Sequence, residues 1–173
     1  MHALSRGDIK RLFDLLNEDL SAQSLTGELY LVGGAVMCLV FNARATTLDV
    51  DAIFEPVGVL REAAAKIGRE SGIGEHWLND AVKGFLSESG TFSEFLDLGS
   101  LKVFCAQPEY LLAMKCLAMR LGREFHDEAD IRYLLRYLNI ESYHEAVSII
   151  TRYYPKNRFP QKTLYALEEI LGY

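Results

Sequence analysis

The sequence predicts an α+β protein in which helices flank a mixed sheet and a helical bundle follows it. Short apolar runs bounded by glycine or polar residues indicate strands at residues 29–32, 48–54, 92–98 and 101–106. Stretches with apolar residues every three or four positions indicate helices at residues 5–20 and 57–71. Every element predicted after residue 107 is a helix, so we expect a core at residues 1–107 and a C-terminal helical region at residues 108–173.

The composition is that of a chain that folds without disulfide bonds. Half of the 173 residues are hydrophobic, and the three cysteines lack C-x-x-C spacing, so we expect buried thiols in a reducing compartment. The N-terminus lacks a basic-then-apolar signal, and the longest apolar run, residues 29–41, is too short to span a bilayer. We therefore expect a cytoplasmic protein without a membrane partner.

Charge is distributed unevenly along the chain. The net charge of -6 argues against a general nucleic-acid coat, but all of this excess lies in residues 1–108, and residues 109–173 hold 9 basic and 9 acidic residues. The basic residues of this second half either form a patch that faces phosphates or lie on ordinary solvated helix faces. They include Arg132, Arg136, Arg152, Lys156, Arg158 and Lys162.

A glycine pair follows the first predicted strand. Ser5 is a plausible N-cap for the helix at residues 5–20, and the strand at residues 29–32 ends at Gly33 and Gly34. Glycines permit a tight turn and a close approach of a ligand, and the short helix after them, at residues 35–41, offers free N–H groups to an anion. The alternative is a simple turn.

Two acids occupy alternate positions of the second strand. Asp49 and Asp51 would point to the same face with Cα atoms roughly 6.5 Å apart. Such a pair on an apolar strand needs compensation, and one or two divalent cations would supply it. Arg44, Thr46 and Thr47 precede the pair and could bind phosphate, although Arg44 could instead form an ion pair with Asp49 or Asp51.

The middle of the chain is less regular. The helix at residues 57–71 is expected to cover the sheet, and residues 92–98 and 101–106 to form a hairpin. Residues 71–90 show no clear hydrophobic periodicity. We expect Trp77 in this segment to be a core anchor rather than a platform on which a base stacks.

The predicted helix that Pro108 opens is apolar on nearly every side up to Leu121, and Gly122 is expected to end it. Lys115, in its middle, either has an anionic partner, a carboxylate or a phosphate, or extends along the helix to water. Arg120 is the other basic residue of this helix.

Asp127 is expected to cap the next helix. Asp130, in its first turn, either interacts with the helix dipole or points towards Lys115 and the acidic strand. Two further helices are predicted at residues 141–152 and 162–171, with Pro155 and Pro160 at their boundaries.

The order of these blocks resembles the nucleotidyltransferase superfamily typified by DNA polymerase β, and within it the bacterial AbiEii-like and MenT-like branch, whose members are often toxins of toxin–antitoxin pairs. Four blocks carry the resemblance, at residues 31–35, 44–52, 108–115 and 127–135. It implies Mg²⁺-dependent (or Mn²⁺-dependent) transfer of a nucleoside monophosphate from an NTP to an acceptor hydroxyl, with pyrophosphate leaving. In MenT-like enzymes the acceptor is the 3′ end of tRNA, so RNA and a cognate antitoxin are the implied partners.

Carried over to this chain, the resemblance implies a role for each candidate residue. Asp49, Asp51 and Asp130 would bind the metal and, with Lys115, form the catalytic set. The triphosphate would be held by a larger group, namely Gly33, Gly34, Arg44, Thr47, Lys115 and Arg120.

The chain departs from the superfamily pattern at one point. The superfamily often carries a third acid on a later strand, but residues 101–104 hold none, so either Asp97 or Asp130 replaces it or activity is reduced. Two hypotheses follow: an active nucleotidyltransferase, or a catalytically inactive nucleotide-binding or partner-binding module of the same fold. For the first, Lys115 and Asp130 should face Asp49 and Asp51 across one cleft.

Overall fold

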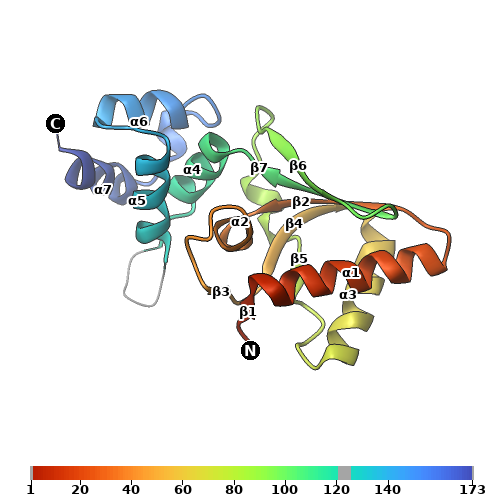
Figure 1. Ribbon diagram of the computed structural model, residues 1–173. Coiled ribbons are helices and arrows are strands. Elements are labelled where there is room, and N and C mark those ends of the chain that lie inside the picture. The colour runs from red at the N-terminus through yellow and green to blue at the C-terminus, as the bar shows by residue number, and fades with distance from the viewer. Residues whose placement is uncertain (1, 121–125, 173) are drawn as a thin grey trace. The chain divides into compact units, whose positions relative to one another are not determined.

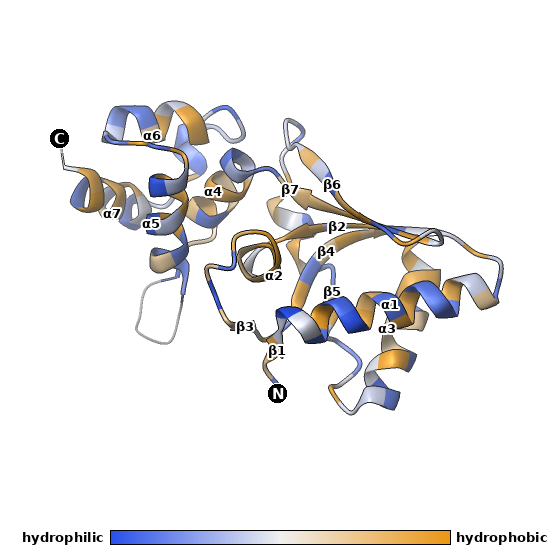
Figure 2. Cartoon of the chain, viewed as in Figure 1, coloured by the Kyte–Doolittle hydropathy of each residue, from blue (hydrophilic) through white to orange (hydrophobic). Residues whose placement is uncertain are grey.

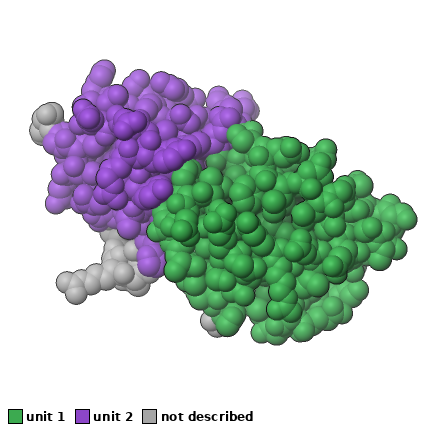
Figure 3. Space-filling model, in the orientation of Figure 1, with its two compact units in different colours: residues 1–84, 92–106 green, residues 85–91, 107–173 purple. Residues whose placement is uncertain are grey.

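The computed structural model describes residues 2–120 and 126–172 and has the predicted α+β class. Its elements divide between two compact units, which Figure 3 colours separately. Unit 1 consists of Met1–Gly84 and Phe92–Ala106, and unit 2 of Phe85–Thr91 and Gln107–Tyr173. The sheet is in unit 1 and the C-terminal helices are in unit 2 (Figure 1).

A five-stranded mixed sheet forms the centre of unit 1. Its strand order is β5-β4-β2-β7-β6; β2 pairs antiparallel with β4 and parallel with β7. The predicted hairpin at residues 92–106 is confirmed, because β6 and β7 are antiparallel neighbours. The strands are β2 (Gly27–Val32), β4 (Val50–Glu55), β5 (Leu78–Asn79), β6 (Phe92–Asp97) and β7 (Leu101–Ala106).

One face of this sheet is covered by helices α1 (Arg6–Ala22) and α3 (Val57–Ser71) (Figure 1). Alternate residues of β2, β4 and β7, such as Leu29, Phe54 and Val103, are buried on this side. Both helices carry a hydrophobic and a hydrophilic side (Figure 2), as their spacing predicts. The opposite face of the sheet bears half-buried or exposed residues, among them Asp51.

Several local features of unit 1 agree with the sequence-based predictions. Ser5 caps α1, and its side chain and that of Asp8 form a reciprocal capping box. Trp77 is 3% exposed and donates from Nε1 to the carbonyl oxygen of Ala64 at 2.8 Å, so it is a core anchor. A small second sheet joins β1 (Leu4–Ser5) to β3 (Thr46–Thr47) and ties the N-terminus to the loop before the acidic strand.

Unit 2 is built from helices. They are α4 (Pro108–Leu117), α5 (Asp127–Tyr137), α6 (Tyr143–Ile150) and α7 (Gln161–Leu171). Residues 85–91 join them: the Ser87 N–H donates to Tyr110 Oη at 3.0 Å, and the Tyr154 hydroxyl donates to the Phe85 carbonyl. This segment was expected within the 1–107 core, but its polar contacts are with α4 and with the residues after α6.

Two predicted helix ends in unit 2 are wrong. Helix α4 ends at Leu117 with Ala118 as its C-cap, before Gly122, which lies outside the described residues. The N-cap of α5 is His126, and Asp127 is the first helical residue. The Asp127 carboxylate accepts hydrogen bonds from the backbone N–H and the Nε of Arg120. None of the helices in the described ranges has the length and apolar composition needed to cross a bilayer.

Candidate functional site

Gly33 brings the turn after β2 against the carboxylate of Asp51. Val32 and Asp51 are partners in the β2–β4 pairing, so the turn begins directly beside this acid. Gly33 has φ 70° and ψ -149°, a conformation that residues other than glycine rarely adopt. A Cβ atom placed on Gly33 would lie 3.1 Å from Asp51 Oδ2. The tight turn predicted for this glycine is therefore present, and the Asp51 carboxylate lies beside it; the approach of a ligand stays a prediction.

Two further predicted site residues, Arg44 and Thr47, lie beside Gly34. A Cβ atom on Gly34 would lie 2.5 Å from Arg44 Nη1 and 2.9 Å from Thr47 Oγ1. The guanidinium and the hydroxyl therefore lie over the first residue of α2 (Gly34–Leu39). Thr47 is buried, while Arg44 and Asp51 are half-buried. Five of the predicted residues, Gly33, Gly34, Arg44, Thr47 and Asp51, thus gather around one turn of unit 1.

Asp49 lies one residue outside the strand on which it was predicted, because β4 begins at Val50. Two hydrogen bonds fix it: Thr47 Oγ1 donates to its carbonyl oxygen at 3.2 Å, and Asn79 Nδ2 donates to its Oδ2 at 3.0 Å. Asp49 and Asp51 still flank the buried Val50, and both are half-buried. Asn79 belongs to the segment for which the sequence pattern was poor, and its role was not anticipated.

The donor set of unit 1 suits a hard cation. Mg²⁺ is commonly held by one or two carboxylates and completes its octahedron with water and substrate phosphates. Asp49 and Asp51 supply two carboxylates, and the Gly33 backbone lies so close to the second of them that an added Cβ atom would be 3.1 Å from its Oδ2. Within the described ranges, no group of three or more His, Cys, Asp or Glu residues is placed to share a metal. A cation here would therefore depend on this pair for its protein ligands.

Lys115 in unit 2 has carboxylate partners. Its Nζ lies 2.7 Å from Asp130 Oδ2 and 3.5 Å from Asp127 Oδ1, and only 9% of its side chain is exposed. Asp130 is 3% exposed. Of the alternatives for Lys115, the carboxylate partner is thus present. Because these residues belong to unit 2, their predicted meeting with Asp49 and Asp51, and the metal-binding role of Asp130, stay predictions.

Arg120, whose side chain is largely exposed, binds Asp127 from the solvent side. Its Nε and its backbone N–H both donate to Asp127 Oδ2 at 2.9 Å, while its side chain remains 61% exposed. Burial raises the pKa of Asp127, but the Arg120 hydrogen bonds and the Lys115 charge outweigh this effect and leave the pKa below its ordinary value. We name Lys115, Arg120, Asp127 and Asp130 the α4–α5 charge cluster. The contact between Asp127 and Lys115 was not anticipated, although the i, i+3 spacing of Asp127 and Asp130 could have indicated their shared face.

The predicted basic patch is only partly available to a ligand. Arg132 is paired with Glu128 at 2.9 Å, and the Arg158 guanidinium lies 5.2 Å from the centre of the Tyr154 ring. Arg136 is exposed on α5, in the same turn as Tyr133 and Tyr137. The rings of these two tyrosines are stacked with centroids 6.4 Å apart, and Tyr137 is 54% exposed. Exposed aromatic rings on which bases can stack, together with basic side chains, are typical of proteins that bind single-stranded nucleic acid.

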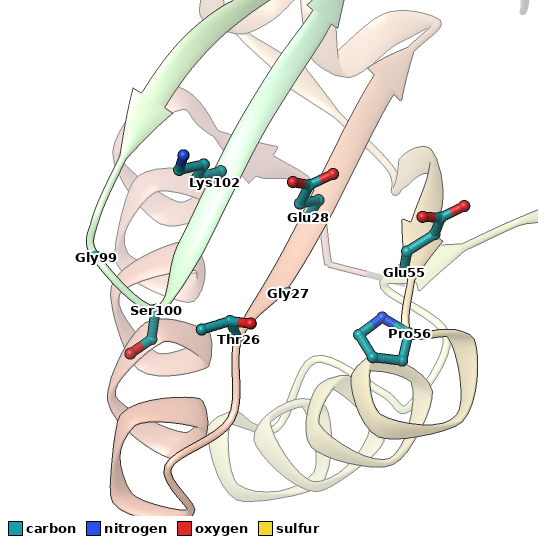
Figure 4. Close-up of a pocket in the computed structure, with 8 residues that line it drawn as sticks. All are labelled: Thr26, Gly27, Glu28, Glu55, Pro56, Gly99, Ser100 and Lys102. Atoms are coloured by element: carbon teal, nitrogen blue, oxygen red, sulfur yellow. The ribbon is translucent and has the colours of Figure 1, made fainter.

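A cavity of about 680 Å³ lies at the other end of the sheet (Figure 4). Glu28 and Glu55 extend into it from neighbouring strands, with Lys102 on the far side of Glu28. These residues stand at the start of β2 and β7 and at the end of β4, whereas Gly33 follows the end of β2. The cavity is thus separate from the Gly33–Asp51 turn.

Comparison with known proteins adds no relative: no family model matches the chain, and neither does any curated protein or solved structure.

Proposed function

We propose that the protein is an Mg²⁺-dependent nucleotidyltransferase that moves a nucleoside monophosphate from an NTP to an acceptor hydroxyl. The observation that carries the proposal is that the Asp51 carboxylate lies beside the Gly33 turn, next to Gly34, Arg44 and Thr47. Acidic, cationic and hydroxyl groups around a glycine turn provide both the cation ligands and the phosphate donors that such a transfer needs.

In the proposed reaction each residue of the turn has one task. Gly33 and Gly34 would let the backbone approach the triphosphate closely, and Arg44 and Thr47 would donate hydrogen bonds to its oxygens. Asp49 and Asp51 would hold Mg²⁺, which would neutralise phosphate charge and lower the pKa of the acceptor hydroxyl. The acceptor oxygen bonds to the α-phosphorus, the bond from that phosphorus to the bridging oxygen breaks, and pyrophosphate leaves. The hydroxyl proton passes to a carboxylate of the pair or to water.

We propose RNA as the acceptor. Support comes from Arg136, Tyr133 and Tyr137 on α5, which combine a cation with stacked rings on an exposed surface. The sequence resemblance points to the 3′ end of tRNA in related toxins.

From the same sequence resemblance we propose that the protein acts in the cytoplasm as the toxin of a toxin–antitoxin pair. Growth arrest on induced expression, absent for Asp49→Ala, is the expected result.

The direct test is transfer of label from NTP to RNA. Wild-type protein with labelled NTPs, Mg²⁺ and total RNA should label a discrete species, and Asp49→Ala should abolish the labelling. Glu55→Ala is the matched control, since Glu55 is an exposed acid at the opposite end of β4. Equal labelling by wild type and Asp49→Ala would refute the proposal. Binding of NTP without transfer would favour the inactive nucleotide-binding module instead.

A further inference from the structure

Asn79 holds the Asp49 carboxylate from the neighbouring strand. It ends β5, which runs parallel to β4, and it is the register partner of Asp51. Its Nδ2 donates to Asp49 Oδ2 at 3.0 Å. Asp49 precedes the first residue of β4, so the strand pairing of β4 does not hold its backbone in place. The hydrogen bond from Asn79 constrains the Asp49 carboxylate instead.

The orientation of the Asn79 amide follows from its second contact. The backbone N–H of Ala81 donates to Asn79 Oδ1 at 3.3 Å. A backbone N–H can only donate, so the atom facing it must be the oxygen, and the atom facing Asp49 must be the nitrogen. Nδ2, which faces Asp49, cannot bind a cation, and Oδ1 faces the Ala81 N–H instead. Asn79 is therefore suited to support a ligand rather than to act as one.

The backbone around Asn79 is anchored on both sides. The Trp77 carbonyl accepts a hydrogen bond from the Val50 N–H at 2.7 Å, and Trp77 is itself buried against α3. On the other side, Asp80 is ion-paired with Arg61 at 2.9 Å and with Lys83 at 2.7 Å. The amide is thus presented from a segment whose position is set by contacts independent of Asp49.

We infer that Asn79 is a positioning residue that fixes the orientation of the Asp49 carboxylate for the catalytic cation. This inference rests on the proposed function. Partners behind a metal ligand hold the orientation of that ligand, and their loss typically costs about 10–100-fold in metal affinity. With only two carboxylates available in the turn, a disordered Asp49 would leave the cation half of its protein ligands.

The test uses Mn²⁺ alone as the probe, with free Mn²⁺ measured by electron paramagnetic resonance. Wild type should bind Mn²⁺, Asp49→Ala should lose binding, and Asn79→Ala should bind about tenfold more weakly. Glu55→Gln is the matched control, because it removes a charge at the opposite end of β4 without touching Asn79 or Asp49, and its affinity should equal that of wild type. Asn79→Leu, which keeps the side-chain volume, is a second variant if Asn79→Ala does not fold.

A second readout separates positioning from general damage to the fold. In the transfer assay, Asn79→Ala should raise the Mg²⁺ concentration for half-maximal rate about tenfold, while the rate at saturating Mg²⁺ stays close to that of wild type. Loss of folded protein would lower the saturated rate and leave the half-maximal concentration unchanged.

The outcomes distinguish the two claims. Unchanged Mn²⁺ binding by Asp49→Ala overturns the cation site and the role of Asn79 together. Loss of binding by Asp49→Ala with wild-type affinity in the folded Asn79 variants overturns the role of Asn79 alone.

Discussion

Lys115 Nζ and Asp130 Oδ2 lie 2.7 Å apart between α4 and α5, and both side chains are almost completely buried. A buried ion pair is costly to break, because removal of one partner leaves the other charge without compensation. Asp127 and Arg120 continue the α4–α5 charge cluster towards solvent. Removal of one member of the cluster should therefore destabilise unit 2, whatever part the cluster has in phosphate binding.

Asp130→Ala should lower the free energy of unfolding by about 3 kcal/mol, because Lys115 would keep its charge in a buried site with only the more distant Asp127. Denaturant unfolding followed by circular dichroism measures this change. The double variant Lys115→Met with Asp130→Leu should lose less stability than Asp130→Ala, since no charge is left unpaired. Equal stability of Asp130→Ala and wild type would contradict the assignment.

Acid should weaken the same cluster through Asp127. Its pKa in the folded protein lies below the ordinary value of 3.8, so its contribution to stability is complete above that value. The contribution is lost as the pH falls from 3.8 through the folded-state pKa. Asp127→Asn should therefore show a shallower loss of stability in this acid range than wild type, as measured by unfolding at a series of pH values. Parallel pH profiles would show that Asp127 does not contribute.

Gly34→Ala should weaken NTP binding about tenfold and also lower stability, because the new methyl group would lie 2.9 Å from the hydroxyl of the buried Thr47. The added methyl group would displace the flexible end of Arg44, whose Nη1 would otherwise lie 2.5 Å away, and a charge-assisted hydrogen bond to phosphate contributes about 1.5–3 kcal/mol. Calorimetric NTP titration checks this expectation.

Gly58→Ala is the control for Gly34→Ala. Gly58 is in α3 and has open space around its Cα, so alanine there should leave binding unchanged and raise stability by up to about 1 kcal/mol. Wild-type NTP affinity in Gly34→Ala would argue against a role for Arg44.

Tyr137→Ala should reduce RNA affinity, because stacking of a base on an aromatic ring contributes about 1–3 kcal/mol. Arg136→Ala should also reduce affinity and make binding less dependent on salt. Tyr165→Ala, a 65% exposed tyrosine on α7, serves as the control. Filter binding at two salt concentrations measures all three, and equal losses in Tyr137→Ala and Tyr165→Ala would contradict a specific α5 surface.

The α+β class and most elements could be predicted from the sequence, because their signals are local. Hydrophobic periodicity defined α1 and α3, and Gly99–Ser100 marked the hairpin between β6 and β7. The cluster of Gly33, Gly34, Arg44, Thr47 and Asp51 followed from a strand, a turn and a strand that pair with each other. Such short connections leave few arrangements open.

Residues that depend on distant pairing were missed. Asn79 lies 30 positions from Asp49, in a two-residue strand that carries no periodicity of its own. Asp127 read as a helix cap, because an acid at a helix start has a local explanation, and only packing of α5 on α4 supplies the stronger partners Arg120 and Lys115.

The central claim, that Asp49 and Asp51 hold a cation for a triphosphate on the Gly33–Gly34 turn, is tested most directly by calorimetric NTP titration with and without Mg²⁺. Wild type should bind NTP only when Mg²⁺ is present, and Asp51→Ala should not bind under either condition. Mg²⁺-independent binding, or equal Mg²⁺-dependent binding by wild type and Asp51→Ala, would contradict it.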